Sequence, residues 1–190
     1  MSGINYKNSS SVGLSAGATA QAGIGGNVRM ENHWIFECHD KHGNLKWTDE
    51  FDNLVVNVGL NDLLDKYLKG SSYTAAFYVG LTDGTPTVDA TDTMSSHAGW
   101  TEVTAYDESV RQDLTLGSVS SQSVDNTASK AVFTVSTNST TIGGGFITTD
   151  STKGGSSGTL YGAGAFSAGD KGLDDGDTLT VTVTLTAAAS

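Results

Sequence analysis

The segment ECHDKHG, residues 37–43, concentrates more reactive side chains than any other stretch of the chain. Cys38, His39, Asp40 and His42 are all residue types that bind metals or take part in acid–base and nucleophilic chemistry. A tetrahedral zinc site, however, needs three or four ligands that converge on one point. The geometry of the local backbone therefore decides whether these side chains form a site.

That backbone is predicted to be a strand followed by a turn. Apolar side chains occupy every second position from Trp34 to Cys38, which is the period of a strand with one buried face. Cys38 is then expected to face the core and His39 the opposite side, because successive side chains alternate across a strand. Residues 42–44, His-Gly-Asn, supply the turn. We expect a core cysteine beside a solvated turn, with His39 and His42 left available for partner contact.

Two groups of carboxylates are further candidates. Residues 170–177, DKGLDDGD, offer oxygen ligands of the kind that calcium prefers, but they lack the spacing of an EF-hand loop, and an acidic turn is the favoured interpretation. Other carboxylates lie near aromatic residues and are of the type that hydrolyses glycosidic bonds, namely Asp49, Glu50, Asp52, Asp107 and Glu108. Nothing in the sequence pairs them. We therefore expect no enzyme, no catalytic residue, no metal site and no cofactor.

Composition limits the classes of partner. The 190 residues carry a net charge of −11, which disfavours binding to a nucleic-acid backbone, where Lys and Arg neutralise phosphates. The same charge disfavours an anionic membrane surface. A single cysteine excludes a disulfide within the chain. No secretory signal or apolar run of membrane-spanning length occurs, so we expect a soluble protein made in the cytoplasm.

Short strand-like segments dominate the chain after residue 30. Apolar residues alternate with Thr in DTLTVTVTLT, residues 177–186, as in a half-buried strand. Further strands are predicted over residues 73–81, 100–106, 110–116, 130–136, 141–149 and 159–167. The turns between them contain Gly, Ser and Asp. This pattern predicts a mainly β fold, an antiparallel β-sandwich or jelly-roll-like barrel.

One segment has the period of a helix instead. Its apolar residues recur three and four positions apart at Leu60, Leu63, Leu64, Tyr67 and Leu68. We predict one short amphipathic helix over residues 58–69, with Asn57 as its N-cap and Gly70 at its end. Such a helix can close one end of a sandwich.

The first 30 residues are predicted to be an extended, flexible arm, and residues 31–190 a single β-rich domain. Gly, Ala and Ser dominate the arm, so it cannot offset its own ordering entropy by burial. We expect the arm to become ordered against a neighbouring molecule. A tail that stays disordered is the alternative.

Three long runs resemble small virion proteins of tailed bacteriophages. They are GNLKWTDEFDNLVVNVGLNDLLDKYLKGSSYTAAFYVGLTDGTPT (43–87), HAGWTEVTAYDESVRQDLTLG (97–117) and GGFITTDSTKGGSSGTLYGAGAF (144–166). The order NLVVN, GLNDLLD, YVGLTDG is the most specific part, and the resemblance extends from about Trp34 to the C-terminus. Relatives of this type look like capsid decoration (cement) proteins, and similar sequences also look like tail-associated structural proteins. The resemblance implies no catalytic residues.

The resemblance leads us to expect a decoration protein on the capsid surface of the virion. It would bind the outer face of the major capsid protein lattice, form homo-dimers or homo-trimers, and contact neither nucleic acid nor membrane. The expected interface residues are Ile4, Tyr6, Leu14 and Ile24 of the arm, together with Trp34 and Trp47 if these are exposed. The alternative is a receptor- or glycan-binding module of the tail. Exposed aromatic side chains beside acidic groups in loops 83–99 and 148–158 would support that alternative.

Overall fold

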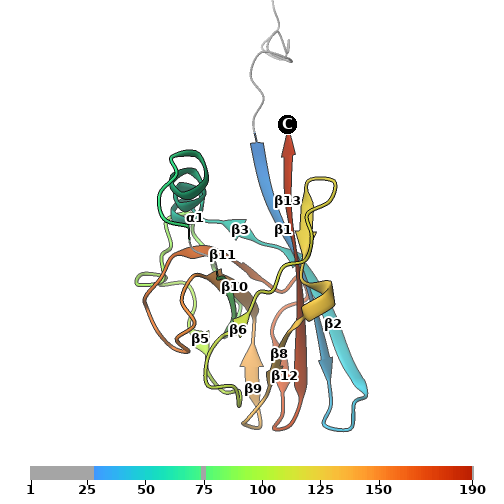
Figure 1. Cartoon of the computed structure of the whole chain (residues 1–190). Coiled ribbons are helices and arrows are strands. Elements are labelled where there is room, and N and C mark those ends of the chain that lie inside the picture. Colours follow the sequence, from blue (N-terminus) through green and yellow to red (C-terminus); the bar gives the residue numbers. More distant parts are fainter. Residues whose placement is uncertain (1–27, 74–75, 190) are drawn as a thin grey trace, which may run out of the picture.

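A computed structural model describes residues 28–73 and 76–189, which form two antiparallel sheets packed face to face (Figure 1). The first sheet contains β1 (Val28–His39), β2 (Leu45–Asp52), β7 (Ser123–Asp125), β8 (Ala131–Thr134) and β13 (Thr178–Ala189). Its order is β2-β1-β13-β7, and β8 also pairs with β13. The predicted mainly β, sandwich-like fold is confirmed.

The second sheet is built from shorter strands. They are β3 (Leu54–Val55), β4 (Tyr78–Thr82), β5 (Glu102–Val103), β6 (Gln112–Asp113), β10 (Gly144–Thr148) and β11 (Leu160–Ala165). Their order is β3-β11-β10-β4-β5, and β6 also pairs with β4. A separate two-stranded pair joins β9 (Thr140–Ile142) to β12 (Lys171–Leu173). The helical segments are α1 (Asn57–Leu63), the π-helical turn η1 (Leu64–Leu68) and the 3-10 turn η2 (Thr127–Ser129).

The pairing of β1 with β13 is the longest in the molecule. The two strands pair over twelve residues each, from Val28 opposite Ala189 to His39 opposite Thr178. β2 joins β1 only from His33 onward, so the first residues of β1 and the last of β13 continue as a ribbon at one pole (Figure 1). The predicted boundary at residue 30 therefore falls inside β1.

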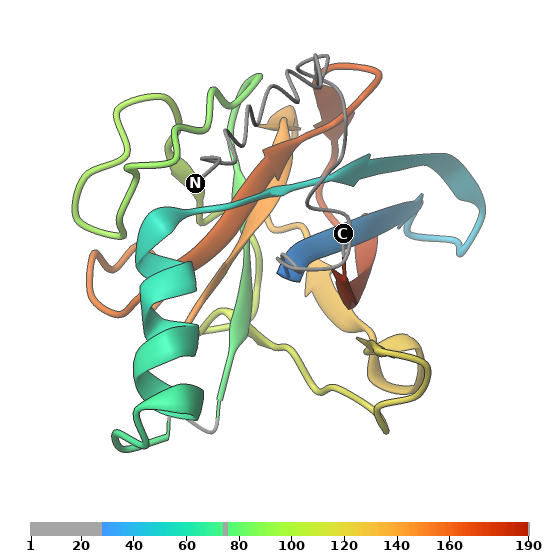
Figure 2. The same ribbon diagram turned by 90° about the horizontal axis from the view of Figure 1, so that it is seen from above.

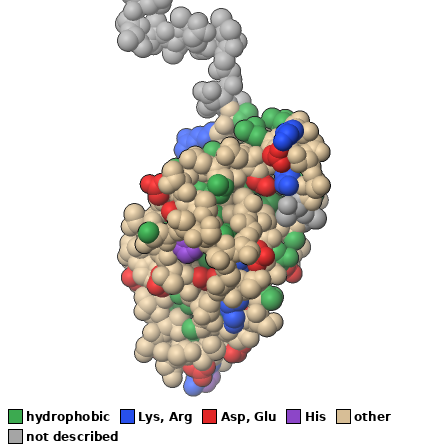
Figure 3. Space-filling model, turned by 90° about the vertical axis from the view of Figure 1, so that its left-hand side faces the viewer, with side chains coloured by type: hydrophobic (Ala, Val, Ile, Leu, Met, Phe, Trp, Pro, Cys, Tyr) green, Lys and Arg blue, Asp and Glu red, His purple; other side chains and the backbone are tan. Residues whose placement is uncertain are grey.

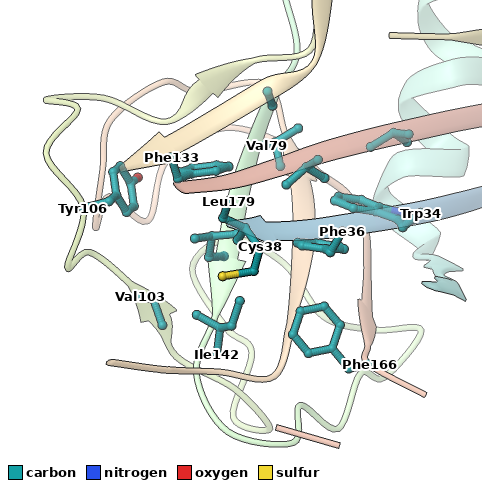
Figure 4. Packing of buried hydrophobic residues seen from close by; sticks show 14 of the residues in the cluster. Trp34, Phe36, Cys38, Val79, Val103, Tyr106, Phe133, Ile142, Phe166 and Leu179 are labelled. Carbon is teal, nitrogen blue, oxygen red and sulfur yellow. The ribbon is translucent and has the colours of Figure 1, made fainter. Parts of the chain in front are cut away.

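Aromatic rings fill the space between the sheets (Figure 4). Trp34 stacks on Phe36 with ring centroids 5.8 Å apart, and Phe51 stacks on both. Phe166, just after β11, meets Phe36 edge-on at 4.8 Å. Since Trp34 and Phe36 sit on alternate residues of β1, the period of two in the sequence places both rings in this core.

The helix lies where it was predicted, but it does not close the sandwich with its whole apolar face. Figure 2 shows α1 at one side of the two sheets. Gly59 is its buried residue, and a Cβ there would lie 2.5 Å from the carbonyl oxygen of Tyr161. Only glycine permits this approach to β11. The later apolar residues, Leu64, Tyr67 and Leu68 of η1, point largely into solvent. The predicted N-cap is wrong: Asn57 is the first residue of α1, and the N-cap position is taken by Val56, which makes no side-chain capping hydrogen bond.

Several strand boundaries differ from the predictions. β4 begins at Tyr78 rather than at residue 73, and β5 and β6 each cover two residues of longer predicted segments. β7 and β12 were not predicted. Each of these short strands is held by pairing with a partner distant in sequence, so local periodicity carries little signal for them.

We predict that Gly80→Ala destabilises the sandwich. A Cβ at Gly80 would lie 2.2 Å from the ring of Phe146, which is fully buried and directly opposite in β10. Overpacking of this kind costs about 1–3 kcal/mol in the free energy of unfolding, measurable by chemical denaturation. Gly172→Ala in β12 is the matched control, since nothing lies within 4 Å of its Cβ position. Equal effects at the two positions would contradict this account of the packing.

Candidate partner-binding surface

The ECHDKHG segment is a strand end and a turn, as predicted. Cys38 is fully buried and His39 lies on the opposite side of β1. Burial raises the pKa of the Cys38 thiol to about 11, and the nearby Asp177 carboxylate adds to the shift. Asp40 accepts hydrogen bonds from the backbone N–H groups of Asn44 and His42, each at 2.8 Å. The segment therefore shapes a turn and does not gather its reactive groups.

The acidic stretch 170–177 is tied into the fold through Asp177. This carboxylate is buried, receives the Lys46 ammonium at 2.5 Å and accepts the Asp174 backbone N–H at 2.8 Å. Throughout residues 28–73 and 76–189, no three His, Cys, Asp or Glu side chains are placed to hold a metal ion. The carboxylate of Asp177 stabilises the turn before β13.

Two of the other candidate carboxylates, Asp49 and Glu108, are also held by structural contacts. Asp49 is buried, lies 2.9 Å from the Lys171 ammonium and accepts hydrogen bonds from Ser167. Burial alone would raise the pKa of Asp49, but the hydrogen bonds from Lys171 and Ser167 outweigh it and lower the pKa. Both carboxylate oxygens of Glu108 accept the Thr134 backbone N–H. Asp49 and Glu108 thus join distant segments of the chain.

A fully buried arginine makes a set of polar contacts that the sequence did not reveal. Arg111 donates to both carboxylate oxygens of Glu102, at 2.9 and 2.7 Å, and to the carbonyls of Asp150 and Gly155. Its guanidinium also lies over the Phe146 ring, 5.2 Å from the centroid. A bidentate pair with two further acceptors satisfies a buried charge. This contact anchors the 150–155 loop to β5, and no local pattern in the sequence signals it.

Large apolar side chains cluster at the surface around η1. We call this the helix-end surface, and its members and their exposed fractions are Leu64 (53%), Tyr67 (81%), Leu68 (73%) and Tyr73 (76%). Figure 3 shows the side of the molecule that carries this helix, with hydrophobic and charged side chains mixed at its upper end. The charges next to the cluster include Lys69, which pairs with Asp65 at 2.9 Å. An apolar cluster ringed by charge is typical of an interaction site.

An apolar cavity of about 220 Å³ lies beneath the helix-end surface. Tyr67 and Tyr73 line it together with Phe77 and Tyr161, whose rings meet edge-on at 5.6 Å. Buried or half-buried aliphatic residues add to the lining, and two charged residues join them at its edge: Leu63, Leu114, Ile147, Leu185, Asp62 and Lys66. The cavity gives a partner's apolar side chain a place to enter, as at the centres of tight protein interfaces.

The sequence-predicted interface residues have different outcomes. Ile4, Tyr6, Leu14 and Ile24 lie outside the described residues. Trp34 is fully buried in the core, so it fails the condition of exposure and is not a surface contact. Trp47 is half-buried and packs edge-on against Phe166. The sequence analysis predicted that the apolar residues of η1 form the buried face of a helix, whereas in the structure they are exposed.

Comparisons with known proteins add no identity to this geometry. No family model, no curated protein and no solved structure matches the chain. In the part of the chain that the structure describes, none of the helices has the length and apolar character needed to cross a membrane. The case for this candidate site therefore rests on the exposure and contacts of its side chains alone.

We predict that Lys171→Met destabilises the fold strongly at neutral pH. The variant leaves the buried Asp49 carboxylate without its ammonium partner, a loss of about 3–5 kcal/mol in the free energy of unfolding. The contribution of Asp49, whose pKa is lowered, is present above the unfolded pKa of about 4 and is lost as pH falls through the folded pKa. The deficit of the variant should therefore shrink in acid.

Lys130→Met is the matched control for this measurement. Lys130 also pairs with a carboxylate, Glu37, but both side chains are partly exposed, and such pairs contribute less than about 1 kcal/mol. Urea denaturation of both variants between neutral and acidic pH tests the difference. Equal losses, or a Lys171→Met deficit independent of pH, would contradict the role assigned to the Asp49–Lys171 pair.

Proposed function

We propose that this protein is a capsid decoration (cement) protein of a tailed bacteriophage, which binds the outer face of the major capsid protein lattice and stabilises the head. The observation that carries the proposal is the helix-end surface, an exposed apolar cluster above an apolar cavity on a two-sheet body. Soluble proteins seldom expose such clusters except where a partner binds. The resemblance of residues 43–87, 97–117 and 144–166 to small virion proteins supplies the class of partner.

The chemistry of the helix-end surface suits a protein partner. Tyr67 and Tyr73 present large rings with few rotatable bonds, the kind of side chain that carries most of the binding energy at interfaces. Lys66, Lys69 and Asp65 provide charged groups beside them, which matches an apolar centre with a polar rim. We assign the apolar centre the contact with the capsid lattice.

The fate of the reactive side chains supports a binding role without catalysis. Within the described residues, Cys38 packs in the core, and Asp49 and Asp177 pair with lysines. Asp40 shapes a turn. We therefore propose no reaction, metal or cofactor for this protein.

Decoration acts by repetition. Each copy ties neighbouring capsid subunits together, so many moderate contacts sum over the shell. Residues 1–27 are proposed to add a second contact through Ile4, Tyr6, Leu14 and Ile24, either to the capsid or to a second copy in a homo-dimer or homo-trimer. The net charge of −11 is compatible with a dense, soluble coat that does not contact nucleic acid.

The tail alternative lacks the feature that would support it. Loops 83–99 and 148–158 contain no Phe, Trp or Tyr. The nearest aromatic residue, Trp100, is buried and stacks on His97 with ring centroids 3.7 Å apart. A tail-associated or receptor-binding role stays as the alternative, and a low copy number in the particle would support it.

Co-sedimentation with capsids that lack this protein tests the proposal. We expect saturation at a fixed ratio to capsid subunits. The double variant Tyr67→Ser/Leu68→Ser should weaken binding at least about tenfold, since exposed aromatic anchors dominate such interfaces. Val119→Ser is the control, because Val119 is equally exposed but lies outside the helix-end surface. A chain lacking residues 1–27 measures the contribution of the N-terminal segment separately.

Two results would count against the proposal. Absence of binding to the shell, or a few copies at a single vertex, would move the protein to the tail. Binding by the double variant equal to that of the Val119→Ser control would remove the helix-end surface from the interface. Thermal unfolding of each variant, with an unchanged midpoint, confirms that the substitutions act on binding alone.

A further inference from the structure

The N-terminal end of β1 is an open strand edge. β13 pairs with β1 along its whole length, but β2 pairs with β1 only from His33 onward. After β2 the chain leaves the first sheet, because Leu54 and Val55 pair with β11 in the second sheet. Among the residues that the structure describes, no strand therefore lies beside residues 28–31 on this side of β1. An unpaired edge of this kind is a template for a further strand.

Two residues of this edge direct their backbone groups outward. The N–H of Asn53 donates to the carbonyl of Asn32 at 3.0 Å, so Asn32 faces the β2 side and Asn53 holds the place opposite it. Because backbone direction alternates along an antiparallel strand, Met30 and Val28 face the same side as Asn32. Neither of them has a backbone hydrogen bond on that side within the described part of the chain. The open edge therefore offers the N–H and C=O groups of these two residues.

A groove of about 410 Å³ runs along the open edge. Residues 28–32 form one wall, and residues 52–55 together with Leu60 form the other. Three large apolar side chains of these walls are exposed, namely Val28 (75%), Leu54 (42%) and Leu60 (37%). Strand addition uses both a free edge and such walls: backbone hydrogen bonds give affinity, and contacts with alternate side chains give specificity.

Two carboxamides in the groove lack hydrogen-bond partners. Asn32 is fully buried, and neither its amide nitrogen nor its amide oxygen has a partner among the described residues. The amide of Asn53 is in the same condition. The buried Asn126, by contrast, donates to the carbonyl of Val181 and accepts the N–H of Val183. Buried polar groups are normally hydrogen-bonded in this way, so the unpaired amides point to a ligand that both donates and accepts hydrogen bonds.

The rim of the groove favours a basic group. Glu31 and Asp52 line the groove, and their side chains are 45% and 81% exposed. Arg29 is the one Lys or Arg among the described lining residues, and it lies 2.8 Å from Glu31. One arginine against two carboxylates leaves one negative charge unbalanced. Opposite charges on neighbouring strands stabilise their pairing, so a Lys or Arg side chain is preferred here.

We propose that this groove binds an extended segment of a partner protein, which adds to β1 as a short antiparallel strand. The direction follows that of the first sheet, in which each pairing of the described strands is antiparallel. One residue of the segment pairs with Met30, and the residue two positions later pairs with Val28. The added strand ends before Asn53, which already holds the place opposite Asn32.

This register defines the chemistry of the segment. The residue opposite Met30 is a diagonal neighbour of Asn32 on the same face, about 7–8 Å away and within reach of a long side chain. A Gln there can meet the unpaired amide of Asn32, because a carboxamide both donates and accepts hydrogen bonds. The preceding residue lies opposite Glu31 on the outer face, where a Lys or Arg balances the charge of the rim. An aliphatic residue suits the place opposite Val28.

This inference does not rest on the assignment of the partner to the capsid. Leu60 lines the groove, whereas the helix-end surface begins one helical turn later, at Leu64. The Tyr67→Ser/Leu68→Ser variant leaves every lining residue of the groove unchanged. Failure of the capsid proposal and failure of this inference are therefore separate results.

Two buried asparagines provide the first test, in the full-length chain. Asn32→Leu replaces an unpaired amide by an apolar group of similar size and so removes the cost of burying unpaired polar atoms. We expect its midpoint of thermal unfolding to rise by about 2–4 °C. Asn126→Leu is the matched control and should lower the midpoint, because it leaves the carbonyl of Val181 and the N–H of Val183 unpaired.

An Asn32→Leu midpoint at or below that of the wild type would overturn the proposal. The chain itself or ordered water would then already satisfy the Asn32 amide, and no ligand would be needed.

Titration with a short peptide tests the added strand directly. The probe is acetyl-Lys-Gln-Thr-Val-amide at millimolar concentration, followed by NMR on the isotope-labelled full-length chain. We expect saturable shifts of the backbone N–H signals of Val28 and Met30 and of the side-chain amide of Asn32. The control peptide carries a methyl group on the Gln backbone nitrogen, which removes the N–H that pairs with the Met30 carbonyl. It should bind at least about tenfold more weakly, although every side chain is kept.

Two further comparisons test the side-chain contacts. Asn32→Leu should weaken binding of the probe at least about tenfold, and acetyl-Glu-Gln-Thr-Val-amide should bind the wild type more weakly than the Lys peptide. Equal binding of the methylated and unmethylated peptides, or no saturable shift in the wild type, would overturn the proposal. Binding only by a chain that lacks residues 1–27 would also overturn it, since the protein's own N-terminal segment would then be the occupant.

Discussion

The fold depends on the register of β1 against β13. Trp34, Phe36 and Cys38 lie opposite Val183, Val181 and Leu179, and all six side chains are buried. A slip of one residue would turn this whole set to the outside, because side chains alternate along a strand. β2 pairs with β1, while β7 and β8 pair with β13, so the first sheet is assembled around this single ladder. The aromatic stack that faces the second sheet follows from it.

The strands that sequence predicted best are those with a strict period of two. β13 shows this alternation along most of its length and lies close to its predicted place, whereas β1 contains the predicted segment from Trp34 but begins earlier, at Val28. β7 and β12 have only three residues each and exist because β13 and β9 pair with them. The position of the helix was predicted correctly. Periodicity, however, shows only which side chains share one face of a helix, and not which part of the protein that face contacts. Gly59 sets the contact, and no hydrophobic pattern marks it.

The same limit governed the candidate site. The alternation of side chains along a strand predicted that Cys38 and His39 lie on opposite faces of β1, and the structure places them so. Sequence could not show that Asp49 meets Lys171, because the two are brought together only by the folded sheets. It also could not decide whether Trp34 was core or surface. The surface that does expose large apolar groups was hidden in a segment that resembled an ordinary packed helix, since exposure depends on the neighbours that the rest of the chain supplies.

The pairing of the first described strand with the last also has a consequence for biosynthesis. β1 is translated well before its main partner β13, because the other strands of both sheets lie between them in the sequence. The first sheet therefore cannot form before β13 has been made, and the bulky residues of β1 stay without their partners until then. Contacts so distant along the chain also slow folding after release. Until β13 is made, these apolar residues are exposed on the nascent chain, and exposed surface of this kind favours aggregation.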